Sequence, residues 1–478
     1  MTSLRSPRLP SIDAVTVVLI AWATLLVGAV TWPLFGPGEF ALRDMVILER
    51  PYLTHASLGF GDVPGRNVPQ DGVLALFATI IPATWVVRLL MVASAALSAL
   101  GAAKLAGPGA WAKAAAMAIA VANPYVIERL LQGQWSLVIA AWLLPLIAAA
   151  GLRGRTGLQI VLLWIASLTP TGAIVATATA FCTNRKPILL LAGAFSSAPW
   201  IVTGLMHSSA GRSAAVGAEV FAPRAEGYVG TLGALLGLGG IWNGDAVPAS
   251  REAGFALFGV ALFAVLAIAY RRIPRPLLLL AAVGFAIACV SWLAPGVMGQ
   301  LIEHVPGAGL LRDGQKWLIL AIPAYVSAAG ALKPILAALA LALSLLQTPD
   351  APVALEELRP VHIAVPEVDH QGRDVYFIDR PSLIERSDGI PVVDPATKAM
   401  NVVESGGLTV DGQVVDQDSP RYLDGLSDPQ AHGIGLIVSP DGHVEDTGAP
   451  AQPREPLGLA LLAVWFLTPL LAVRFKRR

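Results

Sequence analysis

The chain has 478 residues, of which 55% are hydrophobic and 14% are charged, and its mean hydropathy is +0.65. Soluble domains usually carry about 25% charged residues, so this composition predicts a polytopic membrane protein and excludes an ordinary soluble enzyme. The formal net charge is zero, which gives no support to nucleic acid as a partner.

A membrane span needs roughly 20 apolar residues, and we predict about twelve spans. The first, 14–35, is too long for a signal-peptide core, so we expect a retained anchor helix. Segments 157–168 and 170–183 are short and could instead form a hairpin that does not cross the bilayer. The other predicted spans are 80–103, 110–126, 134–151, 187–206, 253–270, 276–295, 311–331, 333–347 and 456–473.

The distribution of basic residues predicts the orientation. With the N-terminus inside, the inner segments contain many basic residues and almost no acids, which is the positive-inside pattern. These residues are Arg5, Arg8, Lys104, Lys113, Arg153, Arg155, Arg185, Lys186, Arg271, Arg272, Arg275, Lys333 and the tail 474–478. A single kinked helix over 311–347 would place this tail outside, so we predict two spans there and cytoplasmic termini in the cytoplasmic membrane.

The polar segments then all fall on the outer side. They are 36–72, 123–135, 207–252, 305–317 and 348–455. Polar groups gathered at one face of a membrane protein indicate a functional site that several loops assemble.

The region 347–455 differs in composition from the rest, being rich in Asp, Pro, Gly and Val. Strand-like runs occur at 361–365, 374–378, 408–415 and 433–438, with a hairpin signal at Asp411-Gly412 and a short helix expected in 421–430. We therefore predict a helical polytopic membrane domain (1–346), a small extracytoplasmic α/β domain (347–455), and a last helix with a basic cytoplasmic tail (456–478).

The first outer loop, 36–72, carries the candidate catalytic acid. Asp44 follows the first span by about ten residues, and an acid at this position is suited to remove a proton from a sugar hydroxyl. Arg43 beside it would lower its pKa and help to position substrate. Asp62 and Asp71 are reserve candidates, and the alternative for Asp44 is a solvated ion pair of the loop.

Two further clusters could hold an anion. Glu128 and Arg129 follow Pro124, which should end or kink the third helix, and Arg129 could contact a phosphate while Glu128 positions substrate. Arg312 and Lys316 are four residues apart, so they should share one helix face and bind phosphate. Helix capping and interfacial anchoring are the alternatives for these clusters.

The glycine-rich stretch 221–244 does not have dinucleotide-binding spacing, so we predict a re-entrant or interfacial helix there. Arg224 could contact substrate or form a structural salt bridge. The seven histidines show no ligand spacing, and both cysteines lie in apolar runs. We therefore expect no cofactor; a divalent metal is compatible with the sequence, but no metal site is indicated.

The chain resembles the GT-C superfamily of integral-membrane glycosyltransferases, and among these the actinobacterial decaprenyl-phosphate-dependent arabinofuranosyltransferases. The residues that carry the resemblance are the loop with Asp44, VPQDGVLALFATIIP (68–82), NPYVIERLLQGQW (123–135), AAWLLPL (140–146), SAPWIV (197–202) and LLRDGQKW (310–317). It implies that Asp44 is the general base and that Arg129, Arg312 and Lys316 hold a lipid phosphate. The chain differs from many members in having Arg43-Asp44 where those members have paired acids.

We therefore expect an inverting glycosyltransferase. It would move a sugar, arabinofuranose or mannose, from a polyprenyl-phosphate donor to an envelope glycan or glycolipid at the outer face of the membrane, in contact with membrane lipids. Two other classes stay open: a translocator of lipids or oligosaccharides, and a non-catalytic membrane protein of envelope assembly.

Overall fold

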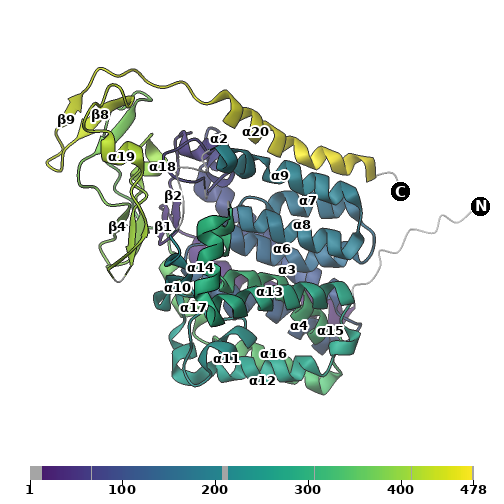
Figure 1. Ribbon diagram of the computed structural model, residues 1–478. Helices are drawn as coiled ribbons and strands as arrows, with labels where there is room; N and C mark the ends of the chain where they lie inside the picture. The colour runs from purple at the N-terminus through teal and green to yellow at the C-terminus, as the bar shows by residue number, and fades with distance from the viewer. Residues whose placement is uncertain (1–12, 66, 207–213, 306, 411, 476–478) are drawn as a thin grey trace, which may run out of the picture.

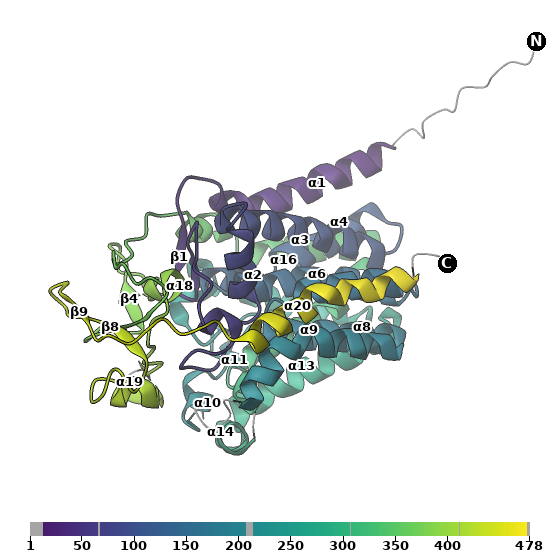
Figure 2. The same cartoon turned by 90° about the horizontal axis from the view of Figure 1, so that it is seen from above.

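The computed structural model describes residues 13–475 except 66, 207–213, 306 and 411. Arg5, Arg8, Asp411 and the last three tail residues, which carried parts of the predictions above, lie outside the described residues. A bundle of helices forms most of the molecule, and the strands gather at one end of it (Figure 1). We call this the polar end; α1 begins and α20 ends at the opposite end of the bundle (Figure 2).

Helices account for most of the described chain. The longer ones are α1 (Ala14–Thr31), α3 (Ala83–Leu105), α4 (Ala110–Ala122), α6 (Trp135–Gly151), α7 (Thr156–Ala166), α8 (Pro170–Asn184), α9 (Pro187–Met206), α12 (Leu257–Ala267), α13 (Arg275–Leu293), α14 (Pro295–His304), α16 (Pro334–Leu346) and α20 (Pro456–Leu467). The shorter ones are α2 (Gln70–Phe77), α5 (Pro124–Leu131), α10 (Gly217–Val220), α11 (Gly230–Leu236), α15 (Ile322–Gly330), α17 (Ala351–Ala354), α18 (Ala396–Ala399) and α19 (Pro420–Asp424).

Seven helical segments of the described chain are long and apolar enough to cross a bilayer, which supports a multi-pass membrane protein. These segments are 14–34, 83–105, 110–131, 187–206, 275–293, 334–358 and 456–475. All twelve predicted spans are at least partly helical, but several are short. Helix α7, with 11 residues, rises about 16 Å, roughly half of a bilayer core. The predicted count of twelve spans is therefore not confirmed.

Helix α6 lies at the centre of the bundle. All of its residues are buried, as expected for a helix that is apolar on every side, and α3, α7 and α8 pack around it. At Gly101 of α3, a Cβ atom would lie 2.4 Å from the backbone nitrogen of Leu146, so glycine permits the close packing of these two helices. The central position of α6 fixes the place of Trp135, where α6 begins at the polar end.

The chain breaks between α4 and α5, as predicted from Pro124. The side chain of Asn123 caps α5 by accepting a hydrogen bond from the backbone N–H of Val126 at 3.1 Å, and Pro124 occupies the first turn. Helix α5 is buried along its whole length. The residues that follow α5 reach the loops of the polar end, where the carbonyl of Gln132 accepts a hydrogen bond from Asp44.

The first loop contains a β-hairpin that the sequence analysis did not predict. Strands β1 (Phe40–Leu42) and β2 (Met45–Ile47) pair in antiparallel fashion, with Leu42 opposite Met45. Arg43 and Asp44 therefore form a two-residue turn, and Arg43 adopts a positive φ of 47°, as residues of tight hairpin turns often do. Every strand residue is buried, so the hairpin is inserted into the polar end and carries Asp44 at its tip.

The remaining strands of the described chain lie between residues 374 and 446. They are β3 (Asp374–Phe377), β4 (Leu383–Glu385), β5 (Pro391–Val393), β6 (Leu408–Val410), β7 (Gln413–Asp416), β8 (Ile434–Val438) and β9 (Val444–Asp446). They form a three-stranded sheet in the order β3-β8-β9, with β3 parallel to β8, and two hairpins, β4-β5 and β6-β7. A small α/β unit thus precedes α20.

Two local predictions in this region need correction. The run 361–365 is not a strand; Val361 forms only an isolated bridge to Glu39. The helix expected over 421–430 is the shorter α19. The α/β unit packs onto the first hairpin, because Ala41, Val46 and Val392 belong to one apolar cluster. That residues 347–455 fold as an independent domain stays a prediction.

Candidate functional site at the hairpin tip

Asp44 is placed by contacts from the segment that joins α5 to α6. Its backbone N–H donates a hydrogen bond to the carbonyl of Gln132 at 3.2 Å, and its carboxylate accepts one from Nε2 of Gln134 at 3.0 Å. The segment 123–135 and the first loop, which the sequence placed on the same side of the membrane, are therefore in direct contact. Gln134 was not among the predicted site residues.

Gly133 makes this contact possible. Its φ is +80°, and a Cβ atom at this position would lie 2.2 Å from the carbonyl oxygen of Leu42 and 2.5 Å from the backbone nitrogen of Met45. Both the backbone conformation and the lack of space exclude other residues. Gln132 and Gln134 thus supply two amide side chains that can donate hydrogen bonds to Asp44. Gly133 between them allows this segment to approach the hairpin closely.

Arg129 fixes the orientation of the Gln134 amide. A guanidinium group only donates hydrogen bonds, and Nη1 of Arg129 lies 2.8 Å from Oε1 of Gln134. The amide oxygen must therefore face Arg129, which leaves Nε2 to donate to Asp44. In the same way, Asn243 donates to Oε1 of Gln132 at 2.8 Å, so the Gln132 amide can act on Asp44 as a donor.

Arg129 itself is fully buried and paired with Asp313. The two guanidinium nitrogens contact the two carboxylate oxygens of Asp313, with Nη2 at 2.9 Å from Oδ1, and Nη2 also donates to Gln315. This two-point pairing holds the guanidinium in one plane. The sequence predicted that Arg129 contacts a phosphate; its burial and its protein partners instead make it a positioning residue for Gln134.

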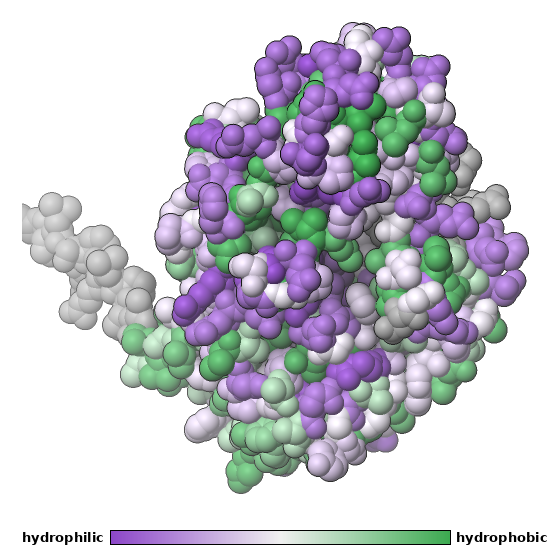
Figure 3. Space-filling view, turned by 90° about the vertical axis from the view of Figure 1, so that its left-hand side faces the viewer, coloured by the Kyte–Doolittle hydropathy of each residue, from purple (hydrophilic) through white to green (hydrophobic). Residues whose placement is uncertain are grey.

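Burial raises the pKa of Asp44. Hydrogen bonds from Gln134 and Gln132 and the charges of Arg129 and Arg312 act in the opposite direction. The carboxylate is nevertheless exposed to solvent. The face that Figure 3 shows, the polar end, is mostly hydrophilic and hollowed near its centre.

The predicted influence of Arg43 on Asp44 is wrong. Arg43 points away, donating to the carbonyls of Leu131 at 2.6 Å and Asp245 at 2.8 Å and pairing with Glu357 at 2.8 Å. Its role is to bind the hairpin to the neighbouring segments. The positive charges that act on Asp44 come from Arg129 and Arg312, which lie far from it in the sequence.

Arg312 and Lys316 do not share the face of one α-helix. A turn separates them, between the 3₁₀ helices η6 (Ala308–Leu311) and η7 (Gln315–Ala321). Arg312 lies over the ring of Phe221, 4.4 Å from its centroid, and forms an ion pair with Asp416 of β7 at 2.9 Å. The backbone N–H of Lys316 donates to Asp313 at 3.3 Å. Both basic residues are half-buried at the polar end.

Glu128 belongs to an ion network whose side chains are fully buried. The predicted contact of Glu128 with substrate is therefore not supported by its position. Glu128 is fully buried, accepts a hydrogen bond from the backbone N–H of Ile241 at 3.1 Å and lies 3.4 Å from Arg251. Arg251 also contacts Glu226, which accepts from the backbone of Gly240 at 2.8 Å. This network ties α5 to the chain after α11.

Arg224 forms the structural salt bridge that was the alternative for it. Its guanidinium lies 2.5 Å from Glu252. This interaction accounts for its position without a substrate.

The two reserve acids bind the α/β unit. Asp71 pairs with Lys398 of α18 at 2.7 Å, and Asp62 lies 3.3 Å from Arg421 of α19. Asp62 also accepts a hydrogen bond from the backbone N–H of Glu404 at 3.0 Å. Within the described part of the chain, Asp44 is thus the candidate acid in contact with the α5–α6 segment, and no group of three His, Cys, Asp or Glu side chains there could hold a metal ion.

A comparison with protein families finds no match, and a comparison with curated proteins finds none either. Among solved structures, the arabinofuranosyltransferase AftD from Mycobacteria is similar to this chain, with a TM-score of 0.47 and 16% sequence identity. The match covers 95% of this chain, which spans only 38% of the length of that chain. A likeness at this level assigns neither a family nor an activity.

Proposed function

We propose that the protein is a membrane glycosyltransferase in which Asp44 is the general base. It transfers a sugar, arabinofuranose or mannose, from a polyprenyl-phosphate donor to a hydroxyl of an envelope glycan or glycolipid. The observation that carries the proposal is the exposed Asp44 at the tip of the first hairpin, whose carboxylate accepts a hydrogen bond from the oriented amide of Gln134. An ionisable group placed in this way beside apolar helices is characteristic of function.

The proposed reaction is a single displacement. Asp44 accepts the proton of the acceptor hydroxyl while that oxygen forms a bond to the anomeric carbon. The bond between this carbon and the phosphate oxygen breaks, and its electron pair leaves with the polyprenyl phosphate. One displacement inverts the anomeric configuration. Burial raises the pKa of Asp44, which makes its carboxylate a stronger base than an ordinary aspartate.

The departing phosphate needs cationic partners. Arg312 acts electrostatically on Asp44, and Lys316 follows it by one short turn, so these two half-buried residues are the proposed phosphate contacts. Arg129 is excluded from direct contact by its burial against Asp313. A phosphate at Arg312 would compete with Asp416, its partner from β7.

The polar end is proposed to face the outside of the cell. Basic residues such as Lys104, Arg153 and Lys333 follow or precede helices at the opposite end, which is the distribution expected for the cytoplasmic side. At the outer face a sugar donor carried on a lipid is available within the membrane, and the exposed apolar residues of the bundle would contact its chain and the surrounding lipids.

The test is transfer by purified protein in proteoliposomes that contain synthetic polyprenyl-phosphate arabinofuranose or mannose. Asp44→Asn should lower transfer by about 100-fold or more, because a general base typically contributes 10²–10⁴-fold. Glu49→Gln, which neutralises an exposed acid of the same loop, should leave transfer unchanged. Transfer by Asp44→Asn at the wild-type rate, or movement of the lipid-linked sugar across the bilayer without transfer, would overturn the proposal.

A further inference from the structure

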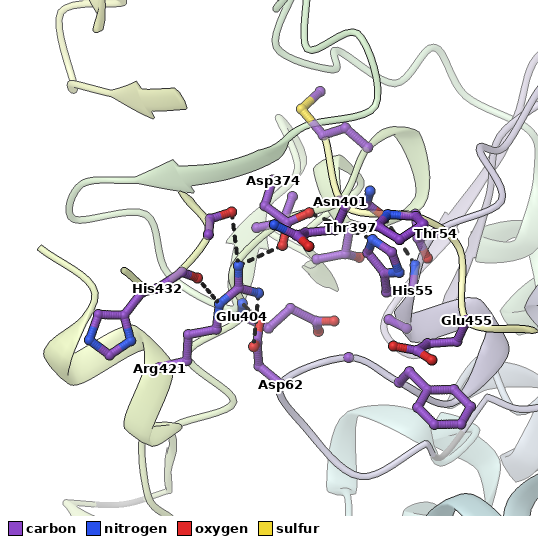
Figure 4. A pocket seen from close by; sticks show the side chains of 18 of the residues that line it. Thr54, His55, Asp62, Asp374, Thr397, Asn401, Glu404, Arg421, His432 and Glu455 are labelled. Carbon is purple, nitrogen blue, oxygen red and sulfur yellow. Dashed lines mark hydrogen bonds and ion pairs between the residues drawn. The ribbon is translucent and has the colours of Figure 1, made fainter. Parts of the chain in front are cut away.

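A second cavity lies apart from Asp44, between the first loop and the α/β unit. It has a volume of about 400 Å³, within the range of roughly 300–1,000 Å³ that is usual for small-molecule sites. Its walls come from residues 54–62, from segments 374–404 and 421–433, and from residues 452–455 before α20. None of the residues that contact Asp44 lines it. Figure 4 shows polar side chains directed into it from several sides.

The charges of the cavity disfavour an anionic ligand. Its one arginine, Arg421, is already paired with Asp374 at 2.6 Å and with Asp62 at 3.3 Å, and it also donates to the carbonyl of His432 at 3.0 Å. Glu404 and Glu455 add two further carboxyl groups to the wall. A phosphate or a carboxylate entering here would meet acids and an arginine that already pairs with two carboxylates.

Two polar atoms in the wall have no hydrogen-bond partner among the described residues. They are Oδ1 of Asp374, a side chain only 5% exposed, and Nε2 of His55. The two atoms are 3.8 Å apart, which is the distance of a long ion pair but too far for a hydrogen bond to each other. An oxygen that donates to one and accepts from the other would satisfy both, and a hydroxyl group does this.

Glu404 supplies a third polar contact. Burial raises its pKa to about 7, an effect that Lys398 opposes and the neighbouring Asp62, Asp71 and Asp394 strengthen. A carboxyl group with this pKa is protonated for part of the time near neutrality, so it both donates and accepts hydrogen bonds. Figure 4 shows Glu404 in the middle of the cavity, between Asp62 and Glu455.

The cavity also has apolar wall, which Phe60, Ala56, Met400 and Val402 contribute. A ring with hydroxyl groups on its edge and C–H groups on its faces matches a wall that combines carboxyl, imidazole and amide groups with an aromatic side chain. We propose that this cavity binds a neutral, hydroxyl-rich saccharide unit, at a site separate from Asp44. Binding there does not require that Asp44 transfers sugar.

The test is binding to the full-length protein in nanodiscs, measured by saturation-transfer NMR and calorimetry. The probes are the neutral oligosaccharides mannotetraose, arabinotetraose and maltotetraose, with trigalacturonate as the anionic control and spermidine as the cationic one. We expect at least one neutral probe to bind, with neither charged control competing for its site. Failure of all three neutral probes to bind, or displacement of a bound one by spermidine or trigalacturonate, would overturn the proposal.

Variants locate the binding. Glu404→Leu should weaken it at least tenfold, whereas Glu404→Gln, which keeps a donor and an acceptor, should retain it. Thermal unfolding of both variants shows whether they are folded. Asp44→Asn should bind like the wild type even where transfer is lost, so the two proposals fail independently. Unchanged binding by folded Glu404→Leu would place the saccharide elsewhere.

Discussion

Nε2 of Gln134 donates a hydrogen bond to the carboxylate of Asp44 at 3.0 Å, across 90 positions of sequence. The first residue lies where α6 begins and the second at the tip of the first hairpin. Because Arg129 holds the oxygen of the Gln134 amide, this hydrogen bond has only one possible direction. The pair therefore opposes the rise in the pKa of Asp44 that burial causes.

Replacing Gln134 should move the pH dependence of transfer. Transfer requires ionised Asp44, so the rate falls as pH decreases through its pKa. A hydrogen bond donated to the carboxylate lowers that pKa, and Gln134→Met removes it. The acidic limb of the pH–rate profile should therefore shift to higher pH, with a smaller change in the rate at high pH.

The pH–rate profiles of the wild type and of Gln134→Met, measured in the same proteoliposomes, check this. Glu49→Gln is the matched control, because this exposed side chain belongs to the same loop. If Gln134→Met does not shift the acidic limb, the group whose protonation causes that limb is not Asp44.

Gly133→Ala should separate the hairpin from the α5–α6 segment. The Cβ atom would lie 2.2 Å from the carbonyl oxygen of Leu42, so one of the two backbones must move. We expect a loss of more than about 2 kcal/mol in the free energy of unfolding and a loss of transfer, because left-handed strain alone costs of order 1 kcal/mol.

Gly154→Ala is the control for this substitution. Gly154 also has a positive φ, of 67°, but no atom lies within 4 Å of the Cβ position. It should show only the conformational cost, of about 1 kcal/mol, and normal transfer. Thermal unfolding of both variants gives the comparison; equal losses would mean that the close contact at Gly133 has no energetic consequence.

The Arg129–Asp313 pair should be more important for orientation than for stability. Arg129→Met alone leaves Asp313 buried without its partner, which should cost about 3–5 kcal/mol. The double variant Arg129→Met/Asp313→Leu removes both charges and should recover most of that stability. Transfer should stay low in both, because Gln134 is no longer held.

Unfolding and transfer measured on the wild type and the two variants separate these effects. A double variant with normal transfer would show that the orientation of Gln134 does not depend on Arg129.

Glu404 should make the stability of the protein depend on pH. Its pKa is raised from 4.5 to about 7 in the folded state, so between these values the folded protein holds a proton that the unfolded chain has lost. Stability should therefore fall as pH rises from about 5 to about 7.5, by at most about 3 kcal/mol from this group. Glu404→Gln cannot titrate and should show a flatter dependence.

The measurement is thermal unfolding of the wild type and Glu404→Gln across this pH range. The difference between the two proteins isolates Glu404 from the other titrating groups. A difference that does not change with pH would contradict the raised pKa.

Local patterns were sufficient for the elements that depend on nearby residues. The apolar runs predicted helices at every span, since a helix satisfies its own backbone within a bilayer. Pro124 predicted the break between α4 and α5, and the alternating run 408–415 predicted the β6–β7 hairpin. The hairpin of β1 and β2 was missed because its strands have three residues each and both faces are buried, so they show no alternation.

The partners of charged residues were harder to predict, because they come from distant segments. Arg43 and Asp44 are adjacent in sequence, yet a hairpin turn directs them to different neighbours. Arg312 and Lys316 are four positions apart, but a turn between two 3₁₀ helices breaks the helical face that this spacing indicated. The amides of Gln132 and Gln134, polar residues at the end of a buried helix, were the signal for the missed contacts.

The sequence by itself determined that the chain is a helical membrane protein with a small α/β unit before its last helix, because the length of apolar runs and the alternation of strands are local properties. Only the tertiary structure decided which polar groups meet. Asp44, Gln134, Arg129 and Asp313 come from three segments that span 270 positions, and they are brought together by the packing of α5 and α6 against the hairpin. Hydrogen-bond geometry between distant segments depends on that packing, which no local pattern encodes.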